Sequence, residues 1–98
     1  MAKQQWTFFT NYGHVLLYIS GHSRKVLREV ATDVGITERQ VQKIVRELVE
    51  AGILVKKKSG RQNFYKVNGN VPLRHPLEEH RTVGELIQLI VGDEEPGT

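Results

Sequence analysis

The sequence predicts a mainly α-helical fold with one small β-hairpin, an α+β arrangement in which three helices precede the hairpin and one follows it. Two observations support this prediction. Apolar residues recur at helical spacing in four segments, and two short β-prone runs flank a glycine-containing turn after the third segment. The 98 residues fit a single domain over residues 1–98, because two separate cores would each be too small to offset the conformational entropy of folding.

The first helix is expected over residues 10–20, where Thr10 or Asn11 can cap the start and Gly21 can end it. Its apolar residues fall at helical spacing and are Val15, Leu16, Tyr18 and Ile19. An aromatic segment precedes this helix and is too apolar to prefer water. Its aromatic residues are Trp6, Phe8 and Phe9. We expect them to pack on the body of the protein or on a partner chain.

Two further helices are expected over residues 25–34 and 37–51, separated by a short turn at Gly35. Thr37 and Gln40 have the S/T-x-x-E/Q spacing of a capping box, which defines where the later helix begins. Each helix has one apolar face, with Val26, Leu27, Val30, Ala31 and Val34 on the earlier helix and Val41, Ile44, Val45 and Leu48 on the later one. The opposite face of the later helix is rich in hydrogen-bond donors.

A β-hairpin is expected over residues 53–67, with strands at 53–58 and 63–67 and a turn at 59–62 that contains Gly60. Its side chains near the turn are mostly basic, so the hairpin has a positively charged tip.

A final helix is expected over residues 82–91, because Thr82 and Glu85 repeat the capping-box spacing. Its apolar stripe is formed by Val83, Leu86, Ile87 and Ile90. This stripe can cover the core of its own chain or pair with the same helix of a second copy. Residues 92–98 form an acidic tail that we expect to fray.

The formal net charge of +3 is unevenly distributed along the chain. The acidic tail holds three acids and no base, so residues 1–91 carry +6, and residues 37–66 hold eight Lys or Arg against three acids. A concentrated positive field of this kind attracts polyanions, and nucleic acid is the leading candidate partner. The alternative is a solvated basic surface with no partner.

Two helices joined by a short turn at residues 34–36 match the helix-turn-helix, whose second helix enters the major groove of DNA. A helix before this pair and a basic hairpin after it complete a winged helix-turn-helix, here with an extra N-terminal segment and a C-terminal helix.

Residues 27–67, LREVATDVGITERQVQKIVRELVEAGILVKKKSGRQNFYKV, resemble the winged-helix domain of the MarR-like transcriptional regulators. The resemblance implies a small prokaryotic regulator that binds double-stranded DNA in a sequence-specific manner. The chain departs from that family in length, since MarR regulators usually carry long flanking dimerisation helices. Here only the aromatic segment and one short final helix could take that role.

The expected DNA-binding residues lie on the recognition helix and on the wing. On the helix, side chains that donate to base edges or phosphates are Thr37, Arg39, Gln40, Gln42, Lys43 and Arg46. On the wing, the candidates for a phosphate backbone or a minor groove are Lys56, Lys57, Lys58 and Arg61, with Arg61 as the groove probe. Alternatively, the helix residues form only the polar side of a surface helix. The wing lysines can likewise serve to keep a short hairpin from pairing with other chains.

Helix-turn-helix proteins commonly read two half-sites as dimers, so we expect a homodimer and an inverted-repeat operator. The candidate interface residues are Trp6, Phe8, Phe9, Val83, Leu86, Ile87 and Ile90.

Several other classes are disfavoured. The sequence contains no cysteine, which excludes disulfides and thiolate metal sites. The histidines lack metal-ligand spacing and no catalytic motif is present, so we expect no metal, no cofactor and no enzymatic activity. With no signal peptide and no apolar run long enough to span a bilayer, a cytoplasmic location is expected.

Two competing functions stay open, because winged helices also serve as protein-docking modules and as RNA binders. A docking module would more often present an apolar or acidic recognition face. An RNA binder would favour exposed aromatic rings, whereas Phe64 and Tyr65 alternate on a strand, so at least one should be buried.

Overall fold

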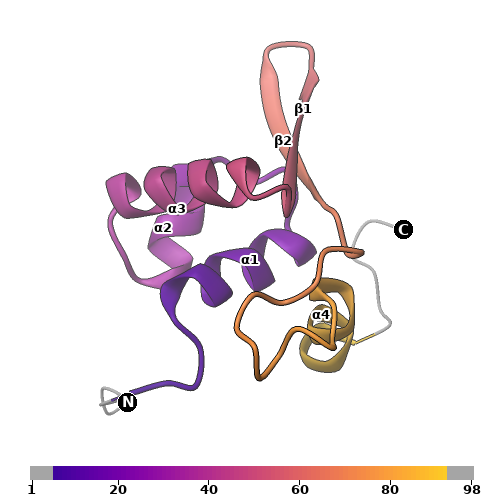
Figure 1. The fold of residues 1–98 in the computed structure, drawn as a ribbon. Helices are drawn as coiled ribbons and strands as arrows, with labels where there is room; N and C mark the ends of the chain where they lie inside the picture. The colour runs from indigo at the N-terminus through magenta and orange to yellow at the C-terminus, as the bar shows by residue number, and fades with distance from the viewer. Residues whose placement is uncertain (1–5, 93–98) are drawn as a thin grey trace.

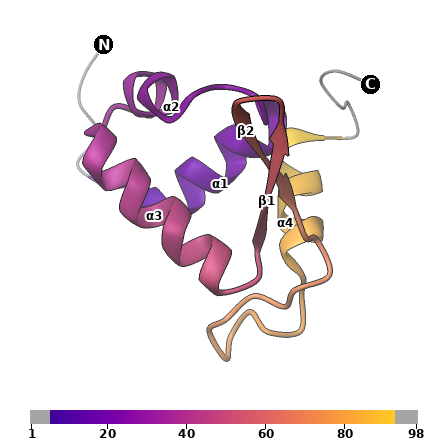
Figure 2. The same ribbon diagram turned by 90° about the horizontal axis from the view of Figure 1, so that it is seen from above.

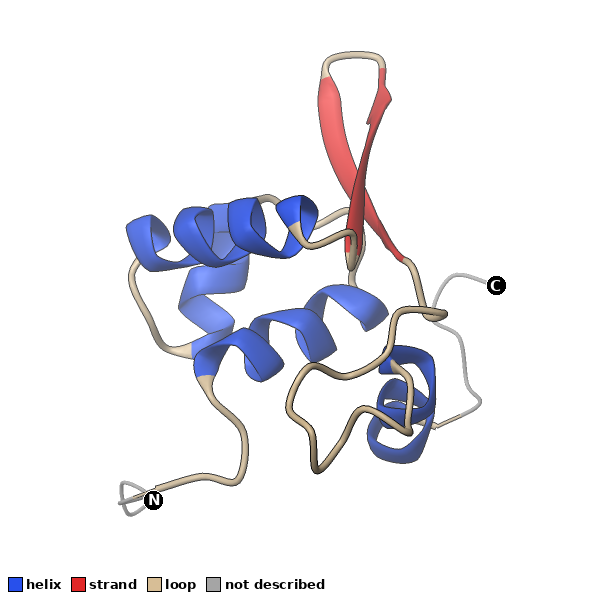
Figure 3. Cartoon of the chain, viewed as in Figure 1, coloured by secondary structure: helices blue, strands red, loops and turns tan. Residues whose placement is uncertain are grey.

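The computed structural model describes residues 6–92, so the acidic tail beyond Gly92 lies outside the described residues. The elements follow in the order α1 (Asn11–Gly21), α2 (Leu27–Val34), α3 (Glu38–Glu50), β1 (Leu54–Ser59), β2 (Gln62–Val67) and α4 (Val83–Val91). Four helices and one hairpin were predicted in this order, and every boundary agrees with its prediction to within two residues (Figure 3).

Helix α1 occupies the centre of the fold, since it packs against α2, α3, β2 and α4. Figure 1 shows α3 and α2 on one side of α1, and α4 near the C-terminal end of α1. The buried apolar residues from all these elements form one cluster: Val15, Leu16, Ile19, Val30, Ala31, Val41, Ile44, Val45, Leu48, Ile53, Leu54, Tyr65 and Val83. The apolar stripes predicted for α1 and α3 therefore face the core as expected.

The start of α2 differs from the prediction. The helix begins at Leu27 rather than at residue 25, and Val26 is its N-cap residue with extended backbone angles. Val26 is consequently 44% exposed, not part of the apolar face. Val26 fits the helical spacing of the apolar residues that follow it, so the sequence prediction included it in the apolar face although the helix begins after it. The end of α2 is as predicted, with Gly35 in the left-handed region at φ 94°, where a side chain would be strained.

The capping box predicted at the start of α3 is present. The Gln40 backbone N–H donates to Thr37 Oγ1 at 3.1 Å, and the Thr37 N–H donates to Gln40 Oε1 at 2.9 Å. Both bonds satisfy donors that the first helical turn leaves without partners. At the other end Gly52 has φ 79°, and the Ile53 N–H returns to the Leu48 carbonyl at 2.9 Å. The chain thereby turns directly into the wing.

The wing is an antiparallel hairpin whose register runs from Leu54↔Val67 to Ser59↔Gln62. This register leaves Gly60 and Arg61 as a two-residue turn, in which Gly60 supplies the positive φ of 63° that such turns need. At its base the hairpin is buried through Leu54 and Tyr65, whereas its outer part projects into solvent (Figure 1).

Helix α4 docks through the chain segment that leads to it. The Val83 N–H donates to the Val71 carbonyl at 2.8 Å and the Gly84 N–H donates to the Gly69 carbonyl at 2.9 Å. The two glycines approach so closely that a Cβ on Gly84 would lie 3.0 Å from the Gly69 oxygen. The predicted capping box at Thr82 is also present. These contacts hold the first turn of α4 against the body, with Val83 fully buried.

The helix pair α2–α3, the preceding α1 and the following hairpin define a winged helix-turn-helix fold of the α+β class. It carries an additional N-terminal segment and the C-terminal helix α4, as the sequence predicted. Among the described residues, no helix is long and apolar enough to cross a membrane.

Candidate nucleic-acid interface

The outer face of α3 lies opposite the residues that anchor the helix in the core, and it carries the polar side chains singled out in the sequence. Thr37, Arg39, Gln40, Gln42, Lys43 and Arg46 are all exposed. Figure 2 shows that α3 runs along the surface of the molecule and that the wing stands beside its C-terminal end. The structure therefore brings the two predicted groups of residues to neighbouring elements.

Within this set, four side chains are already engaged within the chain, and one of them is Gln42, whose side-chain amide donates to Glu38 Oε2 at 3.4 Å. Thr37 and Gln40 bond to each other in the capping box. The Lys43 ammonium lies 3.0 Å from Glu47 Oε2 and donates to the Tyr12 hydroxyl of α1 at 3.1 Å. Tyr12 in turn donates a hydrogen bond to Glu47. Lys43 is thus held toward α1 by two partners.

The electrostatics of this cluster follow from its hydrogen bonds. The bond to Glu47, and then the bond to Tyr12, raise the pKa of Lys43 above its usual value. The hydrogen bond from Tyr12, and then that from Lys43, lower the pKa of Glu47. Both groups stay ionised near neutral pH, so the Lys43 charge is locally compensated by the Glu47 charge.

Arg39 and Arg46 are the two guanidinium groups on the outer face of α3. Neither forms a hydrogen bond or an ion pair with another residue in the described part of the chain. They lie seven residues apart, two helical turns, so they share one face at a separation of about 10 Å along the helix axis. Their donors are free to bind an external acceptor.

The wing carries its charges on both faces. Cross-strand pairing places Lys56 opposite Tyr65 and Lys57 opposite Phe64, and successive side chains of a strand point to opposite faces. Lys56 and Lys58 therefore share one face and Lys57 lies on the other. The sequence prediction had treated the three lysines as a single group.

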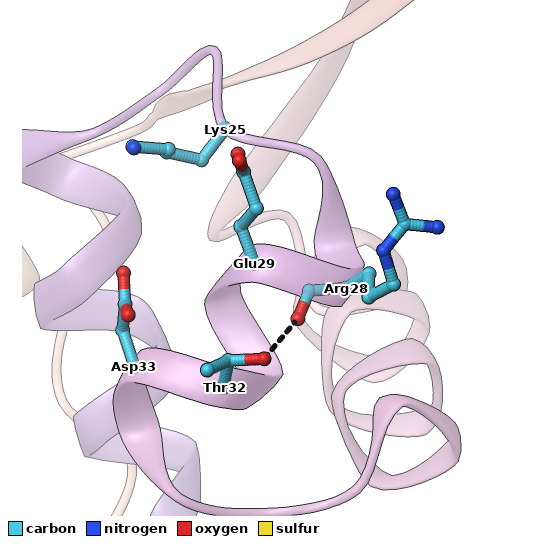
Figure 4. A pocket seen from close by; sticks show the side chains of 5 residues that line it. All are labelled: Lys25, Arg28, Glu29, Thr32 and Asp33. Atoms are coloured by element: carbon cyan, nitrogen blue, oxygen red, sulfur yellow. Dashed lines mark hydrogen bonds between the residues drawn. The ribbon is translucent and has the colours of Figure 1, made fainter.

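The loop between α1 and α2 adds basic residues that the sequence prediction missed. Arg24 lies with its guanidinium carbon 4.2 Å from the centroid of the Phe64 ring on β2. Lys25 and Arg28 are exposed at the start of α2 and line an open hollow together with Glu29, Thr32 and Asp33 (Figure 4). Two bases and two acids line this hollow, so its formal charges balance and we assign it no ligand. The only sequence signal for Arg24 was its basic character, because nothing local indicates contact with a strand 40 residues later.

The candidate dimer residues fall into two separate groups. Trp6 and Phe8 are 68% and 88% exposed and pack edge to face with each other, while Phe9 is half-buried. Trp6 and Phe8 are thus largely exposed, whereas Phe9 lies against Gly13 of α1, where an added Cβ would be 3.0 Å from the Phe9 Cβ. Figure 1 shows this segment and α4 at well-separated ends of the molecule.

On α4 the predicted stripe is only partly exposed. Val83 is buried in its own core and is therefore not available to a second chain, Leu86 and Ile87 are half-buried, and Ile90 is exposed. Leu89, which was not predicted, is 79% exposed. One side of α4 thus covers the core of its own chain. A small apolar surface remains on the other side of the helix.

The described residues contain no group of three or more histidine or acidic side chains placed to hold a metal ion. Within the same residues no polar or charged side chain is buried. Within the described residues, the polar side chains of α3 and the wing are therefore in contact with solvent.

No family model matches the chain, and no curated protein matches it. A solved structure with similarity is that of the zinc-dependent MarR family transcriptional regulator AdcR in the Zn(II)-bound state, with a TM-score of 0.48 and 20% sequence identity. The match covers 69% of this chain and 48% of that one, so this chain spans about half the length of that protein. Similarity at this level carries no conclusion about function, which has to come from the residues of the chain itself.

Proposed function

We propose that this chain is a sequence-specific transcriptional regulator that binds double-stranded DNA. In this proposal α3 enters the major groove, and the wing lies along the phosphate backbone or in the adjacent minor groove. The observation that supports it most directly is the pair Arg39 and Arg46, two exposed guanidinium groups on one face of α3 with no hydrogen-bond or ion-pair partner among the described residues. Arginine is the residue that most often reads guanine in the major groove through paired donors.

The wing and the remaining polar residues of α3 have supporting roles in the proposal. Lys56, Lys57, Lys58 and Arg61 supply the positive charge that phosphate binding requires. Thr37 and Gln40 keep the first turn of α3 formed, and in this proposal Gln42, which is exposed on α3, contacts base edges. Lys43, with its charge compensated by Glu47, contributes less than the two arginines.

The described surface favours DNA over the two other partners of winged helices. A protein-docking face would be apolar or acidic, and the outer face of α3 is basic. An RNA-binding face would expose aromatic rings on which bases stack. On the wing, Tyr65 is buried and the Phe64 ring is covered by Arg24. Phe64 is half-buried, so the wing presents no fully exposed aromatic ring on which a base could stack.

We further propose that the chain acts as a homodimer on an inverted-repeat operator, since helix-turn-helix proteins usually read two half-sites. The surfaces proposed for pairing are the aromatic segment, with Trp6, Phe8 and Phe9, and the part of the α4 stripe that its own core leaves partly exposed, with Leu86, Ile87 and Ile90. Val83 is left out because its own core buries it.

The test is a fluorescence-anisotropy titration of a random duplex and of a duplex selected from a genomic library, at two salt concentrations, with the mass measured by light scattering. We expect tighter binding to the selected duplex and weaker binding as the salt concentration rises. Absence of binding to any duplex at low salt would refute the proposal, and a monomeric complex would refute the homodimer.

Variants then separate the two surfaces. Changing Lys56, Lys57 and Lys58 together to Gln should weaken binding to all duplexes alike and flatten the salt dependence by about 0.9 in logarithmic slope per lost phosphate contact. Arg39→Ala should instead lower the preference for the selected duplex, by about 1–3 kcal/mol for one bidentate base contact. The matched control is Arg74→Ala, because Arg74 is exposed and belongs to the connection between β2 and α4, outside α3 and the wing. That change should leave DNA binding unaltered.

A further inference from the structure

The wing is tied to the α1–α2 loop along its second strand by three contacts. The Tyr65 backbone N–H donates to the Ser23 carbonyl at 3.3 Å. The Gln62 side-chain amide donates to the Arg24 carbonyl at 3.2 Å. The Arg24 guanidinium lies over the Phe64 ring at 4.2 Å. Two consecutive loop residues thus contact three positions of β2.

The contacts of Gln62 and Phe64 lie closer to the tip of the hairpin than the buried residues at its base. Leu54 and Tyr65 anchor the base in the core, and the residues between them on either side of the turn have no buried side chain. A two-stranded hairpin without a packed face is only marginally stable in water. Gln62 directly follows the turn residue Arg61, so the bond from Gln62 to the loop connects the tip of the wing to the body.

The Arg24 side chain is itself held by the aromatic ring. It forms no ion pair with an acidic residue in the part of the chain that the structure describes. A planar guanidinium stacks on a ring, whereas a lysine ammonium offers only a point charge on a flexible stem. The Arg24 backbone, which accepts the Gln62 bond, is consequently oriented by the position of its own side chain over Phe64.

From these contacts we propose that Arg24 is a positioning residue for the wing, and that it fixes the tip so that Arg61 meets the DNA in one defined place. This inference rests on the proposed DNA binding and adds to it a residue of the α1–α2 loop that acts through the wing. Loss of the stack frees Gln62 and lets the turn move relative to α3. Arg61 then contributes less to binding, although it remains in the chain.

A double-mutant cycle on the full chain tests this inference. The variants are Arg24→Lys, which keeps the charge and removes the planar stack, Arg61→Ala, and the two together. Arg61→Ala should weaken binding to the selected duplex about tenfold in the otherwise unchanged protein, as expected for one lost contact. It should cost less than about threefold in the Arg24→Lys background, because the coupled contact is already lost. Equal costs in both backgrounds would overturn the proposal.

The neighbouring Lys25 provides the matched control. It is exposed in the same loop, and its backbone N–H donates to the His22 carbonyl at the end of α1 at 3.2 Å. Lys25→Gln and Arg61→Ala should therefore be additive in their effect on affinity. A coupling of Lys25 to Arg61 as large as that of Arg24 would show a general effect of the loop and would also overturn the specific role of Arg24.

A measurement without DNA separates this inference from the proposed function. Backbone order parameters from ¹⁵N relaxation should fall for Gly60, Arg61 and Gln62 in Arg24→Lys, and in Phe64→Leu, while those of α3 stay unchanged. Unaltered values at the turn would refute the positioning role even if the protein binds DNA. Lowered values would support that role even if no duplex is bound, in which case the proposed function alone would fail.

Discussion

Replacement of Thr37 by Ala tests what defines the start of α3. Thr37 Oγ1 accepts the Gln40 N–H at 3.1 Å, and this bond is lost in the variant. The Thr37 backbone N–H still donates to Gln40 Oε1 at 2.9 Å, so one of the two bonds in the capping box survives. The first turn of α3 then holds one more backbone donor without a protein partner.

The expected cost is about 1 kcal/mol of unfolding free energy, the usual value for loss of a threonine N-cap. In a domain of this size that corresponds to a fall of about 4–8 °C in Tm. Urea unfolding followed by far-UV circular dichroism measures the change, and the slope m should stay constant because the surface exposed on unfolding is the same. Thr37→Ser keeps the hydroxyl and should restore most of the stability.

Thr32→Ala is the matched control. Thr32 lies within α2, is exposed, and donates its hydroxyl to the Arg28 carbonyl one turn earlier at 3.2 Å. Alanine has the higher helix propensity, so this change should leave stability unchanged or raise it by a few tenths of a kcal/mol, up to about 0.7 kcal/mol. If Thr37→Ala and Thr32→Ala change stability by the same amount, the hydroxyl of Thr37 does not cap α3 and the reasoning fails.

Three further changes test other contacts. The hydrogen bond to Asp33 raises the pKa of Tyr18 to about 12 from its usual 10.0, so its contribution to stability should be complete below pH 10 and decline as the pH rises toward 12. Thermal unfolding across this range would show the decline, and Tyr18→Phe should flatten it. Gly84→Ala should destabilise the protein by about 1–3 kcal/mol in equilibrium unfolding, because its Cβ would meet backbone atoms at 3.0–3.2 Å. Unchanged or increased stability would contradict that close approach. Tyr12→Phe should raise the pKa of Glu47 toward its ordinary 4.5, since Tyr12 is the largest cause of its lowering. A carboxyl ¹³C titration that shows the same pKa in both proteins would exclude this bond.

The elements of the fold could be predicted because each is specified by residues close together in sequence. Both capping boxes were predicted from a four-residue spacing, and the turn at Gly60 from its glycine between β-prone runs. The start of α2 was placed too early because Val26 suits the apolar pattern of a helix. The pattern does not show that Val26 supplies the extended residue before the helix. Periodicity reports which face is apolar and is less sensitive to where a helix begins.

Parts of the candidate site depend on contacts between distant residues, which no local pattern encodes. The contact of Lys43 with Tyr12 joins positions 31 apart, so the sequence could not show that this lysine is held toward α1. The ion pair with Glu47 has the i,i+4 spacing of a helical salt bridge and was available from the sequence. Arg24 over Phe64 joins a loop to a strand, and only the folded chain brings the two together.

The separation between the aromatic N-terminal segment and the outer side of α4 has a consequence for the operator (Figure 1). In a dimer, a two-fold axis through one of these surfaces sets one distance between the two copies of α3. A two-fold axis through the other surface sets a different distance between them. Recognition helices of a dimer enter successive major grooves only when this distance matches about 34 Å of duplex or a multiple of it. In the proposed homodimer, the number of base pairs between the half-sites of a selected operator therefore indicates which of the two surfaces joins the two copies.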